Sequence, residues 1–316
     1  MHLIRGFPQP GQVPVGGAIT VGTYDGLHRG HQVLLGRLRE HARRLGGPTV
    51  MLTFEPTPRE YFVPQDPPAR LTSFRERWRC LADLDLDHLA VLRFGAAVRG
   101  LTAEQFIERL ARGFTPAVVV IGHDFRFGRG GTGTPDLLRD AGARLGFEVD
   151  VVEPVVFQGT RISSSAVREA LARGAVTEAE ELLGRPFALT GKVVRGAQLG
   201  RKLGYPTANV RFRRRRLPVG GIYAVRVDVR GGPQGLPGVA SIGTRPTVDG
   251  VEPLLEAHVF DFGGDLYGRE IRVECACFLR PELRFESIEA MVEQIHRDAG
   301  EARRVLGISP APARAL

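Results

Sequence analysis

The chain has 316 residues, 43% of them hydrophobic, which is enough for two domains that each bury a core. Its 43 Lys and Arg against 35 Asp and Glu give a net charge of +8, which suits anionic ligands such as nucleotides. Three cysteines, Cys80, Cys275 and Cys277, exclude a disulfide framework and a four-cysteine zinc site, and we expect small buried thiols in a reducing compartment. No apolar run approaches about 18 residues and no leader pattern opens the sequence, so we expect a cytoplasmic protein without a membrane span.

The first segment that could form a ligand-binding site comprises residues 19–31. A β-rich run ends at Gly22, a glycine-containing turn follows, and His31 opens a segment with helical spacing at Leu35, Leu38, Ala42 and Leu45. A strand followed by a tight turn and a helix is typical of a phosphate-binding site, because the backbone N–H groups and the positive end of the dipole at the helix N-terminus favour an anion. His28 and His31 flank Gly30 there and can donate hydrogen bonds to phosphate oxygens; alternatively, they are surface histidines at a helix end.

Strands and helices alternate through the rest of the first half. We predict strands over residues 49–54, 88–94, 117–121 and 147–152, and helices over residues 73–84, 102–113 and 135–146. The expected helix caps are Ser73 with Glu76, Thr102 with Gln105, and Thr134 before Pro135. This alternation predicts a parallel sheet wrapped by helices, with ligands beyond the carboxyl ends of its strands. The loops 22–31 and 122–133 and the segment before Ser165 then share one site.

Two further patterns bear on that site. Ser163, Ser164 and Ser165 supply hydroxyl and N–H groups at a helix start, with Arg168 about one turn inside; the alternative is a simple helix cap with redundant serines. The run 128–133 fits G-x-G-x-x-G, but residues 124–127 separate it from the preceding strand, so it lacks the tight strand-to-helix turn of dinucleotide-binding proteins. We interpret it as a flexible loop beside a ligand.

The pattern changes after a short helix, which we expect Thr177 and Glu180 to cap and Gly184 to close. Short segments rich in Val follow, separated by Gly and Pro, at residues 189–194, 222–229, 238–242, 254–260 and 271–278. This spacing predicts a small antiparallel barrel or sandwich, with the boundary near residues 184–186. A final amphipathic helix over residues 287–306, with Ile288, Met291, Val292 and Ile295 on one face, should pack on it.

The second half has its own candidate site in residues 191–209. Four glycines allow this stretch to wrap a phosphate closely, and Arg201 and Lys202 add positive charge. Thr207 and Asn209 project to one face of an extended segment and offer neutral oxygens that suit Mg²⁺ beside phosphates, although Pro-Thr-Ala-Asn alone is typical of a turn. Glu256 lies in an apolar strand, either as a buried base for a substrate hydroxyl or, with His258, on the polar face of the strand.

Seven motifs, in this order, resemble the prokaryotic family of bifunctional riboflavin kinase/FMN adenylyltransferases, also called FAD synthetases. They are G-T-Y-D-G-L-H-R-G-H at 22–31, T-F-E-P-T-P at 53–58, G-H-D-F-R-F-G at 122–128, I-S-S-S-A-V-R at 162–168, G-R-K-L-G-Y-P-T-A-N at 200–209, I-G-T-R-P-T at 242–247 and E-A-H at 256–258. The motifs span nearly the whole chain.

The resemblance implies two domains with two ATP-dependent transferase activities. Residues 1–185 would form an α/β nucleotidyltransferase-type domain with a Rossmann-like parallel sheet, which joins FMN and ATP to give FAD and pyrophosphate. Residues 186–308 would form an antiparallel β-barrel with a C-terminal helix, which phosphorylates riboflavin to FMN, and residues 309–316 a frayed tail. The implied partners are ATP, riboflavin, FMN and Mg²⁺, without nucleic acid or a membrane; a monomer and a weak homo-oligomer both remain open.

The resemblance also assigns residues. In the first domain, ATP would be bound by Gly22, Tyr24, Asp25, Gly26, His28, His31, Ser163, Ser164 and Arg168, with His28 and His31 also catalytic. Asp124, Phe125 and Phe127 would line the flavin side. In the second domain, ATP would be bound by Gly191, Gly200, Arg201, Lys202, Gly204 and Pro206. Thr207 and Asn209 would bind Mg²⁺, and Glu256 would accept the proton of the ribityl 5′-hydroxyl.

Several positions depart from the usual pattern of the family. Thr57 stands where histidine is frequent in the family, and Ser241 where asparagine is frequent. Gly131 occupies the place of a frequent basic residue and Thr134 that of a frequent acidic one. Tyr24 replaces phenylalanine but keeps the aromatic ring. None removes a residue assigned to chemistry, so we predict both activities; the alternative is that only the kinase survives. A regulator that binds flavin or RNA is a second alternative, motivated by the net charge of +8 and by Arg211 with the run 213–216. This run lies between strand-like segments, however, which favours a solvated loop.

Overall fold

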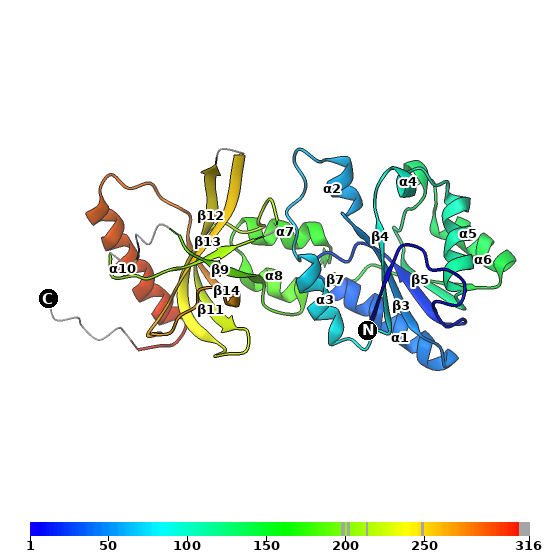
Figure 1. The fold of residues 1–316 in the computed structure, drawn as a ribbon, viewed down its shortest axis with the longest axis horizontal. Helices are drawn as coiled ribbons and strands as arrows, with labels where there is room; N and C mark the ends of the chain where they lie inside the picture. The colour runs from blue at the N-terminus through cyan, green and yellow to red at the C-terminus, as the bar shows by residue number, and fades with distance from the viewer. Residues whose placement is uncertain (197–199, 201–202, 213, 248–249, 310–316) are drawn as a thin grey trace. The chain divides into compact units, whose positions relative to one another are not determined.

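The structure, a computed structural model, describes residues 1–196, 200, 203–212, 214–247 and 250–309. It forms two compact units (Figure 1). The first contains Met1–Pro68 and Phe74–Ser163, and the second contains Ala69–Ser73 and the chain from Ser164 onward. The predicted tail from residue 310 lies outside the described residues.

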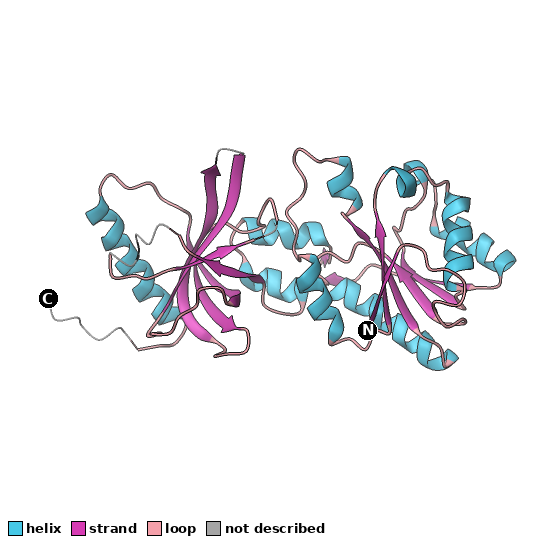
Figure 2. Cartoon of the chain, viewed as in Figure 1, coloured by secondary structure: helices cyan, strands magenta, loops and turns pink. Residues whose placement is uncertain are grey.

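The first unit is built on a six-stranded parallel sheet. In the order β1-β4-β3-β2-β5-β6, its strands are His2–Arg5, His88–Arg93, Thr49–Glu55, Ala18–Val21, Val118–Gly122 and Glu148–Val152. The predicted parallel sheet is therefore confirmed (Figure 2). Strand β1 was not predicted, because its four residues are mostly exposed and carry no apolar periodicity.

Helices lie on both faces of this sheet. They are α1 (Arg29–Leu45), α2 (Pro58–Phe62), α3 (Phe74–Ala82), α4 (Ala96–Arg99), α5 (Ala103–Phe114) and α6 (Pro135–Leu145), with a 3₁₀ turn η1 at Arg129–Gly131. Val119 and Ile121 pack in one core cluster with α5 and α6, whereas Val118 and Val120 pack in the other with α1. Successive residues of β5 thus bury opposite faces, as expected for a central parallel strand.

Capping residues predicted from the sequence lie at the starts of two helices in this unit. Thr102 and Gln105 form the predicted capping box of α5, and Thr134 accepts a hydrogen bond from the N–H of Leu137 at the start of α6. Helix α1 begins earlier than predicted, at Arg29, because His28 caps it. Of the residues with the predicted helical spacing, Leu35, Leu38 and Ala42 are buried, whereas Leu45 at the end of α1 is 38% exposed.

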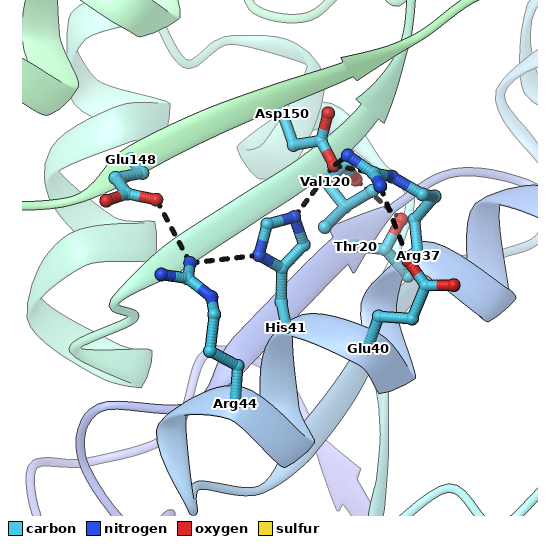
Figure 3. A network of polar contacts seen from close by, with 8 residues as sticks. All are labelled: Thr20, Arg37, Glu40, His41, Arg44, Val120, Glu148 and Asp150. Carbon is cyan, nitrogen blue, oxygen red and sulfur yellow. Dashed lines mark hydrogen bonds and ion pairs between the residues drawn. The ribbon is translucent and has the colours of Figure 1, made fainter.

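A polar network fastens α1 to β6 (Figure 3). The guanidinium of Arg44 donates to His41 Nδ1 at 3.2 Å, so the neutral His41 ring carries its proton on Nε2, which lies 2.8 Å from Asp150 Oδ2. Arg37 donates to the same carboxylate. This network holds α1, whose N-terminus faces the candidate site, against the edge strand of the sheet.

The second unit contains a closed antiparallel barrel. In barrel order its strands are β10 (Ala208–Arg211), β13 (Gly250–Val259), β12 (Leu236–Thr247), β11 (Gly221–Val229), β14 (Glu270–Arg280) and β9 (Ala188–Val194). The predicted barrel is confirmed, and α10 (Ile288–Val305) contacts β11, β12 and β14. Strand β10 was not predicted, because its four residues follow a glycine-rich stretch and are too few to show alternation.

Two short helices, α7 (Ser164–Ala172) and α8 (Val176–Leu183), group with the barrel in the structure. Gly184 ends α8 in the left-handed conformation, as predicted. The predicted capping box of Thr177 and Glu180 is wrong, since α8 begins two residues earlier, at Val176, and Ala175 occupies its cap. The functional boundary at residues 185 and 186 stays a prediction.

Three predictions about single side chains need correction. Cys275 is buried, but Cys80 and Cys277 are only half-buried. Arg214 belongs to the predicted solvated loop, yet it is 9% exposed and donates to the carbonyl of Arg70 at 3.1 Å. Ile288, predicted on the packed face of α10, is 57% exposed, and the buried residues of α10 are Asp298, Ala299, Ala302 and Arg303.

Among the described residues, none of the helices combines the length and the apolar character that a membrane crossing requires.

Candidate functional site

The loop between β2 and α1 places two histidine rings at a helix N-terminus. His28 is the N-cap of α1, and its Nδ1 accepts the backbone N–H of His31 at 3.3 Å. Because Nδ1 accepts, the neutral His28 ring carries its proton on Nε2, which is then a hydrogen-bond donor. The two rings stack with their centroids 3.6 Å apart, and Tyr24 lies 5.0 Å from the His31 ring. Neighbouring side chains thus hold both imidazoles in place.

Tyr24 is a buried part of this loop. Its hydroxyl is hydrogen-bonded to Thr20 Oγ1, and Thr20 Oγ1 donates to the carbonyl of Val120 at 2.7 Å. The Tyr24 hydroxyl is therefore the donor to Thr20, and burial raises its pKa far above the ordinary value, so it stays protonated. The hydroxyl that distinguishes Tyr24 from the usual phenylalanine anchors the loop to β2 and β5.

A cavity of about 480 Å³ opens beyond the carboxyl ends of β2, β3, β5 and β6. Its wall includes the expected residues Gly22, Tyr24, His28, His31, Asp124, Phe125 and Ser163. The loops 22–31 and 122–133 and the segment before Ser165 thus meet at one edge of the sheet, as the strand topology predicts.

Other expected residues lie elsewhere in the described structure. Asp25 and Gly26 belong to the same loop, and Asp25 is 6% exposed, but neither is part of the described cavity wall. Phe127 lies in the core, 6% exposed, with its ring 5.4 Å from that of Phe125. Ser164 and Arg168 belong to α7 in the second unit, where Arg168 Nε donates to the carbonyl of Ala69 at 2.6 Å.

Sequence reasoning missed three cationic residues of the cavity wall. These are Arg59, Arg126 and Arg161, and each lies within or beside a quoted motif. Arg161 ends the two-stranded hairpin of β7 (Val156–Phe157) and β8 (Thr160–Arg161), and it pairs with Asp124. Burial acts to raise the pKa of Asp124, but the hydrogen bond and charge of Arg161 outweigh it, so the pKa lies below its ordinary value. Asp124 is ionised at neutral pH.

The glycine run 128–133 is not a strand-to-helix turn. Gly128 adopts φ +73° before η1, and Gly133 lies against the ring of Phe127, where a Cβ would come within 2.5 Å of ring carbons. A bridge between Phe127 and Gly133 closes the loop. This geometry argues against a dinucleotide-binding fingerprint, in agreement with the prediction from residues 124–127.

The second unit has a cavity of about 360 Å³ between one face of the barrel and α10. Gly200, Thr207 and Glu256 of the expected set line it, together with Met291 and Ile295 of α10. These two apolar side chains of the predicted packed face therefore form a cavity wall rather than a buried contact. Arg280 and Asp298 close the wall with two hydrogen bonds of 2.8 and 2.7 Å.

Strand β13 explains the position of Glu256. Leu255 and Ala257 are buried, whereas Glu256 and His258 alternate with them and line the cavity. Glu256 lies opposite Asn209 on β10 and Ser241 on β12. Glu256 and His258 thus share the polar face of β13, as one interpretation of the sequence holds, and this face lines a cavity; the role of Glu256 as a base stays a prediction.

The two predicted magnesium ligands lie next to two glycines of the 191–209 stretch. A Cβ on Gly196 would come within 2.4 Å of Asn209 Oδ1, and a Cβ on Gly200 within 3.4 Å of Thr207 Oγ1. The approach to Asn209 thus requires glycine at position 196, whereas glycine at position 200 is required by the carbonyl of Tyr205, which would lie 2.3 Å from a Cβ there. The neighbouring His258 ring donates through Nδ1 to the carbonyl of Pro206 at 2.9 Å, which holds the chain just before Thr207.

The other residues expected to bind ATP in this unit lie in different structural positions. Gly191 lies within β9, where a Cβ would meet Val210 and Arg211, so packing alone explains its glycine. Gly204 adopts φ +84°, and the backbone N–H of its neighbour Tyr205 donates to the carbonyl of Gly200. Arg201 and Lys202 lie outside the described residues.

The positions that depart from the family pattern have local structural roles. Thr57 caps α2, and the backbone N–H of Thr57 donates to Glu60 Oε2 at 2.9 Å. Thr134 caps α6, and Gly131 adopts φ +69°, which favours glycine. Ser241 Oγ lies 3.5 Å from Glu282 Oε1 in the barrel cavity.

Comparison with known proteins decides the family. A family model described as FAD synthetase matches residues 12–166, and one described as riboflavin kinase matches residues 183–306. A bifunctional riboflavin kinase/FMN adenylyltransferase from Escherichia coli (strain K12) is 45% identical over 98% of this chain and 99% of its own length. The chain belongs to the bifunctional riboflavin kinase/FMN adenylyltransferase family. The predicted family and the predicted order of its two enzymatic domains are confirmed.

Two further proteins that resemble this chain extend this finding. A protein of the same name from Pseudomonas fluorescens is 44% identical over 96% of this chain and 97% of its own length. A crystal structure described as a macrolide-efflux protein from Streptococcus pneumoniae has a TM-score of 0.81 at 31% identity, covering 94% of this chain and 97% of that one. The likeness to that structure shows the same fold along nearly the full length.

Proposed function

We propose that residues 1–185 transfer the adenylyl group of ATP to FMN, and that residues 186–308 transfer the γ-phosphoryl group of ATP to riboflavin. The observation that carries this proposal is a cavity in each compact unit, each lined by motif residues of the corresponding half of the family. The partners are the small molecules ATP, riboflavin and FMN. Because all three cysteines are free thiols, we also propose a cytoplasmic location.

In the first reaction, a phosphate oxygen of FMN attacks the α-phosphorus of ATP, and the bond to the β-phosphate oxygen breaks to release pyrophosphate. The departing pyrophosphate gains negative charge. His28, Gly30 and His31 at the N-terminus of α1 line the cavity, so that the helix N-terminus and the Nε2–H of His28 can stabilise this charge together with His31. Arg59, Arg126 and Arg161 add positive charge to the same wall, whereas Phe125 offers a ring to the flavin.

In the second reaction, the 5′-hydroxyl of riboflavin attacks the γ-phosphorus of ATP, and ADP leaves. The hydroxyl loses its proton, and Glu256 is the carboxylate of the cavity wall that we assign to accept it. Apolar side chains of α10, such as Met291 and Ile295, suit the flavin ring on the opposite wall.

Magnesium fits the donors of the second unit. Thr207 and Asn209 offer two neutral oxygens and no positive charge, a set that Mg²⁺ accepts when phosphates and waters complete its coordination. When bound with ATP, the ion would neutralise phosphate charge. We propose these two residues as its protein ligands.

Two substitutions test the assignment of one reaction to each unit. His31→Ala should reduce FAD formation from FMN and ATP by roughly 100- to 1,000-fold, because it removes a donor at the phosphates. FMN formation from riboflavin should persist in the same protein. Val33→Ala on the same helix, 44% exposed and outside the described cavity wall, is the matched control and should leave FAD formation unchanged. Loss of both activities in His31→Ala would contradict two separate sites.

A further inference from the structure

We propose that Arg77, which no motif of the sequence singles out, is a positioning residue for the phosphate-binding loop of the first unit. This inference rests on the proposed adenylyl transfer. Arg77 lies on α3 and is 2% exposed, and among the residues that the structure describes it is the largest fully buried side chain. A buried guanidinium is costly unless it is paired and hydrogen-bonded, so its partners show what it holds.

The guanidinium of Arg77 joins the loop to the end of β3. Its Nη1 donates to the carbonyl of Thr23 at 2.5 Å, and its Nη2 lies 3.0 Å from Glu55 Oε2. Thr53 Oγ1 donates to the same Thr23 carbonyl at 3.4 Å. One backbone carbonyl of the loop is thus held from α3 and β3 together.

This carbonyl determines the orientation of the next peptide N–H. The peptide group is planar and trans, so the N–H of Tyr24 points away from the Thr23 carbonyl and therefore away from Arg77. Thr23 and Tyr24 both line the cavity, whereas Arg77 is not part of its described wall. Arg77 thus acts through the backbone of the loop rather than by touching a ligand.

The loop needs such support because its conformation is unfavourable by itself. Tyr24 and Leu27 adopt φ values of +51° and +46°, in the left-handed region that side chains other than glycine disfavour. Such residues persist only where the surroundings hold them. Without Arg77, part of the binding energy of the ATP phosphates would be spent on ordering the loop, which weakens ATP binding.

The test compares Arg77→Met with Arg77→Lys in the full-length protein, with FMN and ATP as substrates. Met keeps an unbranched side chain but removes every donor, and we expect the KM for ATP to rise roughly tenfold or more while the KM for FMN stays within about twofold. Lys keeps a charge and donors at this position, so Arg77→Lys should recover most of the ATP affinity. Thr53→Val removes only the second donor and should raise the KM for ATP slightly.

Controls separate positioning from a loss of folded protein. A purely structural role would lower kcat without changing either KM, because only the active fraction would fall, and that result would overturn the proposal. Arg303→Lys changes a second buried arginine, bound to Asp261 in the other unit, and should leave the KM for ATP in FAD formation unchanged. If Arg77→Met does not fold, an unchanged KM for ATP in Thr53→Val overturns the proposal and a raised one supports it. Wild-type protein that forms no FAD would instead contradict the proposed function.

Discussion

At the scale of single residues, Glu256 is the side chain on which the kinase assignment depends most. Glu256→Gln keeps the shape and removes the base, and we expect FMN formation to fall by roughly 100- to 10,000-fold. FAD formation from supplied FMN should not change. Glu252→Gln, at an exposed position of the same strand, is the control. A Glu256→Gln protein with wild-type FMN formation would remove Glu256 from the mechanism.

His88, at the start of β4, gives the first unit a pH-dependent stability. Burial lowers the pKa of His88, and His2 and the N-terminal amine lower it further, although Asp87 acts in the opposite direction. The unfolded chain therefore binds this proton first as the pH falls. The stabilisation is complete above about pH 6.5 and is lost as the pH falls toward the lower folded pKa.

The matching measurement is urea unfolding of wild type and His88→Gln at pH 7.5 and 5.5. Wild type should lose more free energy of unfolding between these pH values than the variant, because the variant has no proton to bind at this position. Equal losses in the two proteins would show that His88 does not carry this dependence.

Single residues also show what sequence can and cannot predict. His28 and His31 were found because glycine, strand and helix patterns place them within a few residues of each other. Arg161 and Arg77 were missed, since their contacts with Asp124 and Thr23 join residues 37 and 54 positions apart. Such contacts depend on which strands are neighbours, and local patterns do not contain that information.

At the scale of elements, α10 is held against the barrel by a buried ion pair. Asp298 is 6% exposed, binds Arg280 through two hydrogen bonds and accepts a third from Gln294 at 2.9 Å. Because the first half of α10 lines the barrel cavity, this pair also supports the cavity wall.

Asp298→Asn leaves the Arg280 charge without its counter-ion and should cost about 3–5 kcal/mol of unfolding free energy. The KM for riboflavin should rise as well, because the cavity wall loosens. Glu301→Gln on the same helix breaks only the exposed pair with Arg304 and should leave the free energy of unfolding nearly unchanged. Urea unfolding compares the two variants; equal costs would contradict the importance of the buried pair.

The elements differ in how well sequence predicts them. Central strands such as β5 are continuous apolar runs and were found almost to the residue. The short strands β1, β7, β8 and β10 were missed, because two to four residues cannot show a period. The capping box expected for α8 failed because the helix begins at Val176, after a cap residue that makes no side-chain cap bond.

At the scale of the whole molecule, two units of different architecture each contain a cavity, and the product of one proposed reaction is the substrate of the other. Sequence predicted the two architectures because the spacing of apolar segments changes near residue 184. It did not predict that α7 and α8 group with the barrel, since this depends on contacts that form only after the chain has folded.

The most direct test of two active sites in one chain is a chromatographic time course of the purified protein with riboflavin, ATP and Mg²⁺. We expect FMN to appear first and then to decline as FAD accumulates. FMN that accumulates without FAD, even when FMN and ATP are supplied directly, would contradict an active adenylyltransferase site, and a reaction that forms no FMN would contradict the kinase site.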